Sequence, residues 1–311
     1  MKAFIAIFVL LVMYGTSHAQ EILVEEIPMT NGDIEIPGEL TYPKSEEKIP
    51  LVVFVHGSGN GDRNGNQSPL VNTNLIKQLA DSLTIKGFGF YRYDKRSSIP
   101  ENMERWGKPS LLDIVADVNV VIDYFGSDKR FSGIHLIGHS QGSLIAMMAN
   151  HQKARTFTSL AGAGTTIDQT LIGQITAQNQ ELGKITEQHI KELIQTDTIQ
   201  QVNPFLLSIF APKNQSYLKE WISLDPIKEI KTVNIPVLII NGDSDTQISL
   251  KDAQRLKDAK SNAELVVIPK MNHVLKTVEN PTENTASYSN PDFPLSVELI
   301  KELVEFISSN G

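Results

Sequence analysis

Short, densely apolar runs alternate along the chain with segments whose apolar residues recur every three or four positions. The apolar runs, which are rich in β-branched residues, cover residues 49–55, 88–93, 134–138, 156–160, 235–240 and 263–268. Runs that are apolar at nearly every position are typical of strands buried on both faces of a parallel sheet. Helical spacing falls between and after them, over residues 74–85, 111–125, 144–149, 250–256 and 295–307. This alternation predicts an α/β fold with a mostly parallel central sheet and helices on both faces.

Two segments depart from this alternation. Residues 22–28 and 34–42 are short strand-like runs on either side of Asn31, Gly32 and Asp33, which predicts an antiparallel hairpin. Residues 165–230 contain no strand-like run, and their apolar positions, from Ile167 onward, follow helical spacing. We interpret this stretch as a helical cap inserted over the carboxyl edge of the sheet, because long inserts are usually functional. The alternative is a helical domain unrelated to any site.

The first residues have the pattern of a secretory signal peptide. Lys2 is the only charge before Glu21, residues 3–14 are apolar, and the small residues Ser17 and Ala19 follow. The apolar run is shorter than the roughly 20 residues that a membrane span needs. We therefore expect residues 1–19 to be removed, residues 20–311 to form one α/β domain, and the mature protein to be exported to the periplasm or beyond. The alternative is that these residues stay attached as an uncleaved membrane anchor. No other segment is apolar over enough residues to insert stably in a membrane.

Composition narrows the function. Apolar residues make up 41% of the 311 positions and charged residues 21%, which suits a large buried core. The formal charge is −8, so nucleic acid is not an expected partner. The chain has no cysteine, which excludes disulfides, cysteine-ligated metals and a thiol nucleophile.

Because the chain has no thiol, a serine motif supplies the candidate nucleophile. Gly138, Ser140 and Gly142 form the pattern G-x-S-x-G between a predicted strand and a predicted helix. A sharp strand-to-helix turn strains the serine and exposes its hydroxyl, and side chains two positions away on either side would collide. The backbone N–H of Gln141 then lies at a helix N-terminus, where it can stabilise an oxyanion. We expect Ser140 to be a nucleophile.

These features resemble the α/β-hydrolase superfamily, and the likeness runs from about Glu21 to the C-terminus. In that family the catalytic order is serine, acid, histidine, with the acid after a late strand. The pattern G-x-x-D-x-x-V aligns with Gly242, Asp245 and Ile248, which selects Asp245 as the acid. Asp243 is the rival, and its expected role is hydrogen bonding within the turn. His273 follows the last predicted strand and is the expected base.

The resemblance also implies a second oxyanion donor. The loop after residues 49–55 begins with His56, Gly57, Ser58 and Gly59, and the family's position for the donor is Ser58, with Gly59 as the alternative. A subgroup of bacterial hydrolases has H-G-S-G here and R-Y-D-K-R after the next strand, as in residues 92–96. That subgroup contains carboxylesterases active on short acyl esters. The Ser-Ser-Ile-Pro of residues 97–100 departs from the glycine-rich sequence usual there.

The resemblance therefore implies a metal-independent serine esterase that needs no cofactor and cleaves small soluble esters, and the signal-peptide pattern adds that it is exported. Residues 166–200 contain no Phe, Trp or Tyr, which favours soluble substrates over a lipid surface. A serine aminopeptidase-like activity is the alternative, with Glu181, Glu187 or Glu192 holding a substrate ammonium. A non-catalytic binding protein on the same scaffold is the remaining class.

Overall fold

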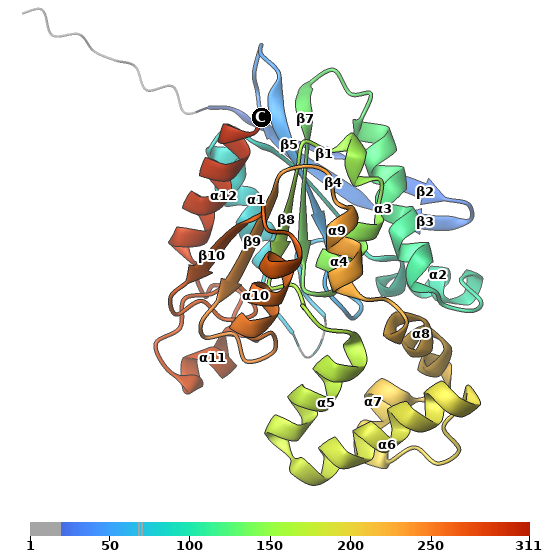
Figure 1. Ribbon diagram of the computed structural model, residues 1–311. Helices are drawn as coiled ribbons and strands as arrows, with labels where there is room; N and C mark the ends of the chain where they lie inside the picture. The colour runs from blue at the N-terminus through green and yellow to red at the C-terminus, as the bar shows by residue number, and fades with distance from the viewer. Residues whose placement is uncertain (1–19, 68, 70) are drawn as a thin grey trace, which may run out of the picture.

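The computed structural model of the protein describes residues 20–67, 69 and 71–311 (Figure 1). The predicted signal peptide, residues 1–19, lies outside the described residues. Within the described ranges, no helix is both long enough and apolar enough to cross a membrane.

Eight strands form one central sheet in the order β1-β4-β6-β5-β7-β8-β9-β10. Their bounds are Ile22–Glu26 (β1), Gly38–Pro43 (β4), Gly89–Tyr93 (β6), Ile49–Val55 (β5), Phe131–His139 (β7), Thr156–Leu160 (β8), Val237–Gly242 (β9) and Glu264–Ile268 (β10). All neighbours from β6 to β10 in this order are parallel, whereas β1 and β4 pair antiparallel at one edge. The predicted mostly parallel sheet is confirmed.

Helices cover both faces of this sheet, as predicted. The residues of β5 alternate between the faces: Leu51, Val53 and Val55 belong to one core cluster, and Val52 and Phe54 belong to the other. The first cluster is completed by α3 (Leu111–Phe125), α4 (Gln141–Met148), α9 (Pro226–Thr232) and α10 (Leu250–Ala259). The second is completed by α1 (Leu75–Ile85) and α12 (Val297–Ser309) (Figure 1). This two-sided burial explains why the strands are apolar at nearly every position.

The N-terminal hairpin is more broken than expected. Its tip, β2 (Met29–Asn31) paired with β3 (Ile34–Ile36), turns at Gly32 and Asp33 and forms a separate two-stranded sheet. The antiparallel pairing is confirmed, because β1 pairs with β4 in the central sheet. The strand predicted over residues 34–42 was wrong in its continuity, because Pro37 divides it into β3 and β4, and the short strand β2 after Pro28 was not predicted. Proline lacks the N–H that would continue a ladder.

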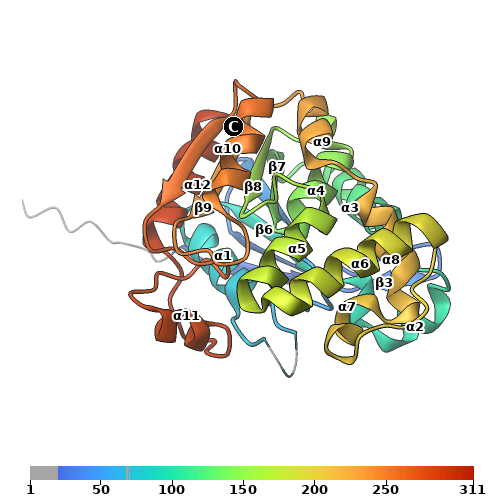
Figure 2. The ribbon, with the colours of Figure 1, turned by 60° about the horizontal axis from the view of Figure 1, so that its bottom comes forward.

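Residues 161–236 contain helices and no strand. Helices α5 (Ile167–Gln178), α6 (Gln180–Thr196), α7 (Leu207–Phe210) and α8 (Pro212–Ile222) pack around an apolar cluster of their own, which includes Leu193, Phe210 and Leu218. These four helices lie beyond the carboxyl ends of the parallel strands, and Figure 2 views them from that side. The predicted insertion extends to about residue 230, but Ile230 of α9 packs in the main core. We call residues 167–222 the helical insertion.

Two short helices have no counterpart among the predicted elements. Helix α2 (Pro100–Arg105) follows β6, and α11 (Pro281–Ser287) follows β10. Each begins at a proline, which suits the first turn of a helix because its missing N–H is not needed there. Residues 97–100, where the sequence departs from the family pattern, therefore lead from a 3₁₀ turn into α2 rather than into a glycine-rich loop.

Candidate active site

Ser140 occupies the sharp turn between β7 and α4. Its backbone has φ 54° and ψ −120°, a positive-φ conformation that is rare for a residue with a side chain. The turn is held because the Ser140 N–H donates to Leu160 O at 2.9 Å and the Ser143 N–H donates to Ser140 O at 3.0 Å. Gln141 is the first residue of α4, so its N–H has no partner within the helix.

The two glycines of the motif are required by close backbone packing. A Cβ on Gly138 would lie 2.4 Å from Gly142 O, and a Cβ on Gly142 would lie 2.1 Å from Val55 O. Neither position can accept a side chain without moving the backbone. The strand β5, the strand β7 and the start of α4 therefore meet at van der Waals distance beside Ser140.

Asp245 and His273 are brought together from the ends of β9 and β10. His273 Nδ1 donates to Asp245 Oδ2 at 2.8 Å, and the Asp245 side chain is fully buried. The other oxygen, Asp245 Oδ1, accepts from the N–H groups of Gln247 and Ile248 at 2.7 and 2.9 Å. Each carboxylate oxygen is thus hydrogen-bonded, which fixes its orientation toward the imidazole.

Asp243 has a different role. It is exposed, and its Oδ1 accepts from the Lys270 N–H at 2.6 Å and from Ser244 Oγ at 3.2 Å. These bonds tie the turn after β9 to the turn after β10. Asp245, and not Asp243, is the carboxylate that contacts His273.

We call residues 269–277 the β10 loop, because this segment follows β10 and carries His273. Asn272 is 1% exposed, donates to Asn284 Oδ1 at 2.9 Å and to Ser287 Oγ at 2.8 Å, and accepts from the Lys276 N–H at 3.0 Å. Lys276 is fully buried and donates to Phe293 O at 2.6 Å and to Gln78 Oε1. Sequence patterns noted Asn272 only as the neighbour of His273 and gave neither residue a role, because their partners lie on α11, α1 and the segment before α12.

We call residues 56–67 the β5 loop, which carries Ser58 and Gly59. Among the described residues, the Ser58 N–H has no hydrogen-bond partner. His56 Nε2 donates to Tyr93 O at 2.7 Å, which joins the start of the loop to β6. Gly59 has φ 88°, a left-handed backbone conformation that favours glycine, so the loop needs glycine at this position.

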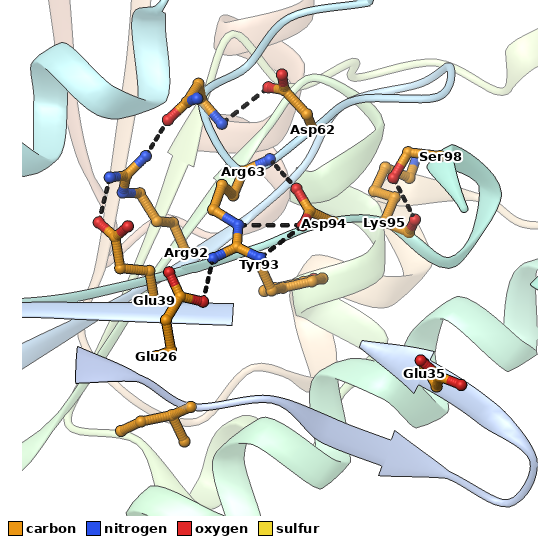
Figure 3. A network of polar contacts seen from close by, with 12 residues as sticks. Glu26, Glu35, Glu39, Asp62, Arg63, Arg92, Tyr93, Asp94, Lys95 and Ser98 are labelled. Carbon is orange, nitrogen blue, oxygen red and sulfur yellow. Dashed lines mark hydrogen bonds and ion pairs between the residues drawn. The ribbon is translucent and has the colours of Figure 1, made fainter. Parts of the chain in front are cut away.

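The R-Y-D-K-R block of residues 92–96 holds the β5 loop (Figure 3). The Asp94 carboxylate accepts from the Arg63 N–H at 2.7 Å and from its guanidinium at 2.8 and 3.0 Å. Arg92, which is paired with Glu39, donates to Asn64 Oδ1. Lys95 Nζ donates to Gly57 O at 2.8 Å. The charged residues of this block therefore set the conformation of the loop beside Ser140.

A pocket of about 260 Å³ lies between the β5 loop, the turn at Ser140 and the β10 loop. Ser140, His273, Ser58 and Gly59 all line it, and the rest of the wall is mainly apolar, aromatic or amide side chains together with glycines. No described Asp, Glu, Lys or Arg lines it, and neither does any residue of the helical insertion. The insertion instead contacts the core beside the pocket, where Gln141 Nε2 donates to Tyr217 OH at 2.8 Å and Gln174 Nε2 donates to Gln247 O at 2.9 Å.

The predicted site residues are not all in direct contact. In the described part of the chain, no hydrogen bond joins the Ser140 hydroxyl to His273. Such bonds are often long in enzymes without substrate and shorten when it binds. The same part of the chain has no group of three His, Cys, Asp or Glu side chains placed to hold a metal ion.

Two further histidines form part of the pocket wall. Burial lowers the pKa of His56 and of His139 to about 3, so both rings are neutral at ordinary pH. His139 Nε2 is 2.9 Å from His273 O and donates to that carbonyl, and the two rings are 5.0 Å apart. His139 therefore holds the backbone of the β10 loop.

Comparison with known proteins places this arrangement in a family. The family described as "Serine aminopeptidase, S33" matches residues 71–226, half of the chain, and this region contains Ser140. Esterase EstD of Thermotoga maritima is 26% identical over 246 residues, which cover 77% of this chain and 58% of the relative. The chain thus spans less than two thirds of that relative's length.

Solved structures share the fold. An esterase of Pyrococcus furiosus, Pf2001, superposes with a TM-score of 0.60 at 15% identity, covering 94% of this chain and 92% of that one. The acylaminoacyl peptidase of Pyrococcus horikoshii superposes with a TM-score of 0.59 at 16% identity, covering 92% of this chain and 41% of that one. Esterases and a peptidase therefore share this architecture. The chain has the α/β-hydrolase fold and belongs to the serine aminopeptidase S33 family.

Proposed function

We propose that this protein is a serine carboxylesterase that hydrolyses small, soluble, short-acyl esters through a covalent acyl-enzyme. The observation that carries the proposal is the convergence of three groups on one pocket: a strained serine at a strand-to-helix turn, a histidine bonded to a buried carboxylate, and a backbone N–H without a partner among the described residues. The similarity to Esterase EstD supports the same activity.

Ser140, His273 and Asp245 divide the chemistry among them. Because the Nδ1–H of His273 donates a hydrogen bond to Asp245, the unprotonated Nε2 is left as the base. His273 Nε2 takes the Ser140 proton as Oγ bonds to the ester carbonyl carbon. The proton then passes to the leaving alkoxide as its bond to carbon breaks. Water repeats the sequence on the acyl-enzyme, releasing the acid and restoring Ser140.

The tetrahedral intermediate carries a negative charge on the former carbonyl oxygen. The N–H groups of Gln141 and Ser58 are the donors for it, one at the start of α4 and the other in the β5 loop. Preorganised backbone donors of this kind each contribute about 10²–10³ to the rate.

The pocket favours a short, uncharged acyl group. Its volume of about 260 Å³ lies below the range of roughly 300–1,000 Å³ that is usual for drug-sized ligands. Leu75, Ile76 and Val71 supply apolar wall, and no described Asp, Glu, Lys or Arg side chain lines it. The small pocket is the argument for soluble substrates. The helical insertion does not add to it, because its apolar side chains Ile194, Phe205 and Leu207 are exposed.

The proposal is tested by hydrolysis of p-nitrophenyl esters from acetyl to octanoyl between about pH 6 and 9. We expect activity on the shorter chains, and a loss of about 10⁶-fold in Ser140→Ala. Substantial activity in Ser140→Ala would contradict the mechanism, and no activity on any ester would contradict the function. Labelling of Ser140 by a fluorophosphonate would dismiss a non-catalytic binding protein.

An aminopeptidase activity is the second candidate, because the family bears that description. Releasing an N-terminal residue calls for a group that binds the substrate ammonium, and none of Glu181, Glu187 and Glu192 lines the pocket. Glu181 pairs with Lys184, and Glu192 accepts from the Gln200 N–H. Parallel assays with aminoacyl-p-nitroanilides separate the two activities, and faster turnover of the anilides would favour the peptidase.

We also propose that the protein is exported, on the pattern of residues 1–19. Mass spectrometry of the protein recovered from the periplasmic and culture fractions tests whether residues 1–19 have been removed. Loss of these residues is the expected result, and full-length protein retained in the cytoplasm would contradict it.

A further inference from the structure

We propose that Lys95 is a positioning residue for the oxyanion site, acting through the peptide group that joins Gly57 to Ser58. The inference rests on the proposed function and adds a residue to that site. Its basis is that Lys95 Nζ donates to Gly57 O at 2.8 Å, on the same peptide group that presents the Ser58 N–H.

A peptide group transmits this contact directly. It is planar and trans, so its C=O and N–H point in opposite directions. A donor that fixes the direction of Gly57 O therefore also fixes the direction of the Ser58 N–H, which belongs to a pocket-lining residue. A positive charge on the carbonyl oxygen also polarises the amide and strengthens its N–H as a donor.

Among the described residues, the Lys95 ammonium donates to the Gly57 carbonyl and forms no other hydrogen bond. The side chain is 3% exposed, and its ammonium forms no ion pair with any described residue. Asp117, a buried carboxylate whose charge acts on Lys95, is paired with Arg96 at 2.5 Å and also accepts from Asn31 Nδ2 at 2.8 Å. A buried ammonium without a carboxylate partner is costly, which is a reason to look for a functional role.

The other bonds of Lys95 hold its backbone in place. Its N–H donates to Gly61 O at 3.2 Å, and its carbonyl accepts from Ser98 Oγ at 2.7 Å and from the Ser98 N–H at 2.8 Å (Figure 3). The side chain therefore extends from a fixed turn to the start of the β5 loop. Replacing it alters the contact with Gly57 and leaves these backbone bonds available.

The test compares Lys95→Met with Ser98→Ala on the preferred p-nitrophenyl ester. Methionine keeps the apolar stem and removes the donor, whereas Ser98→Ala loses one bond in the same turn and keeps the ammonium. We expect Lys95→Met to lower kcat about 10–100-fold with KM changed less than about threefold, because the oxyanion exists only after attack. Its affinity for a boronic acid transition-state analogue falls in parallel, and Ser98→Ala stays close to wild type.

A second measurement uses the unchanged protein and does not depend on the folding of a variant. Burial lowers the pKa of Lys95 to about 8, and the charge of Asp117 opposes that shift. His56, the other titratable group that interacts with Lys95, is neutral because burial lowers its pKa to about 3. Wild-type kcat should therefore decline above about pH 8 while thermal unfolding shows the protein still folded. The charged, non-titrating Lys95→Arg should lack that decline if it folds.

The outcomes separate the two proposals. Wild-type protein that hydrolyses no ester would overturn the proposed function and this inference with it. Wild-type activity together with an unchanged kcat in folded Lys95→Met would overturn this inference alone. So would a wild-type kcat that stays flat from about pH 7 to 10, whatever the variants do.

Discussion

The β5 loop and the β10 loop both line the pocket beside Ser140, but different chemistry holds each of them. Ionised side chains of β6 and the turn after it anchor the β5 loop, through Asp94 on Arg63 and Lys95 on Gly57. The β10 loop is held by the amide and hydroxyl contacts of Asn272, by the buried ammonium of Lys276 and by the Asp245 carboxylate, and among the described residues none of these forms an ion pair like that of Asp94 with Arg63. The difference follows from what each loop presents in the proposed mechanism, in which a backbone donor needs a fixed peptide group whereas a base needs a fixed imidazole.

The largest effect is expected from breaking the carboxylate contact of the β10 loop. In Asp245→Asn the amide no longer fixes the tautomer or balances the imidazolium, so kcat on the ester should fall about 10⁴-fold. Asp243→Asn is the matched control, because Asp243 bonds the Lys270 N–H and does not touch His273. A larger loss in the control than in Asp245→Asn would reverse the roles of the two carboxylates.

The next effect comes from the charged contacts of the β5 loop. Asp94→Asn weakens three bonds to Arg63, and we expect kcat/KM to fall by about 10² because the second oxyanion donor loses its position. Glu26 is the other carboxylate on Arg63 and its side chain is 66% exposed, so Glu26→Gln should change kcat/KM little. If both variants behaved alike, the loop would not depend on the buried pair.

A smaller effect is expected from the amide contacts of Asn272. Asn272→Ala leaves Ser287 and the Lys276 N–H without this partner, so the free energy of unfolding should fall by about 1–3 kcal/mol. Urea unfolding measures it. A loss of activity greater than that of Asp245→Asn, with stability unchanged, would contradict a purely supporting role.

The smallest effect is a pH dependence of stability that both loops share. His56, in the β5 loop, donates to Tyr93 O of β6, and His139 donates to His273 O in the β10 loop. Both have pKa values lowered to about 3, while the unfolded chain binds their protons near pH 6.5. Their stabilising contribution is present above pH 6.5 and is lost as pH falls toward 3. The stability gap between wild type and His139→Gln should therefore narrow by about 1–2 kcal/mol on going from about pH 7.5 to 5. A constant gap would mean that His139 does not titrate differently in the two states.

Sequence patterns predicted the core of the fold because burial on both faces leaves a strong local signal. The run 49–55 became β5, and the glycines around Ser140 predicted the turn into α4, which begins at Gln141 rather than at residue 144. The strand predicted over residues 34–42 was misjudged because its apolar alternation continues past Pro37, although proline cannot donate to a ladder.

The supporting contacts of the site were beyond local patterns. Lys276 and Gln78 are 198 positions apart, and Arg63 and Glu26 are 37 apart, so nothing near either residue indicates its partner. The R-Y-D-K-R block was visible in the sequence, but its contacts with Gly57 and Asn64 depend on how β5 and β6 lie side by side. Ser140, Asp245 and His273 could be singled out in the sequence because each follows a recognisable strand.

The central claim is that Ser140 forms a covalent acyl-enzyme assisted by the two loops. Its most direct test is intact-protein mass spectrometry of the purified protein quenched during turnover of a short-acyl p-nitrophenyl ester. The account predicts an added mass equal to the acyl group, located on the peptide that contains Ser140 and absent from folded Ser140→Ala. Hydrolysis that continues undiminished in Ser140→Ala, or an acyl group located on another residue, would contradict it.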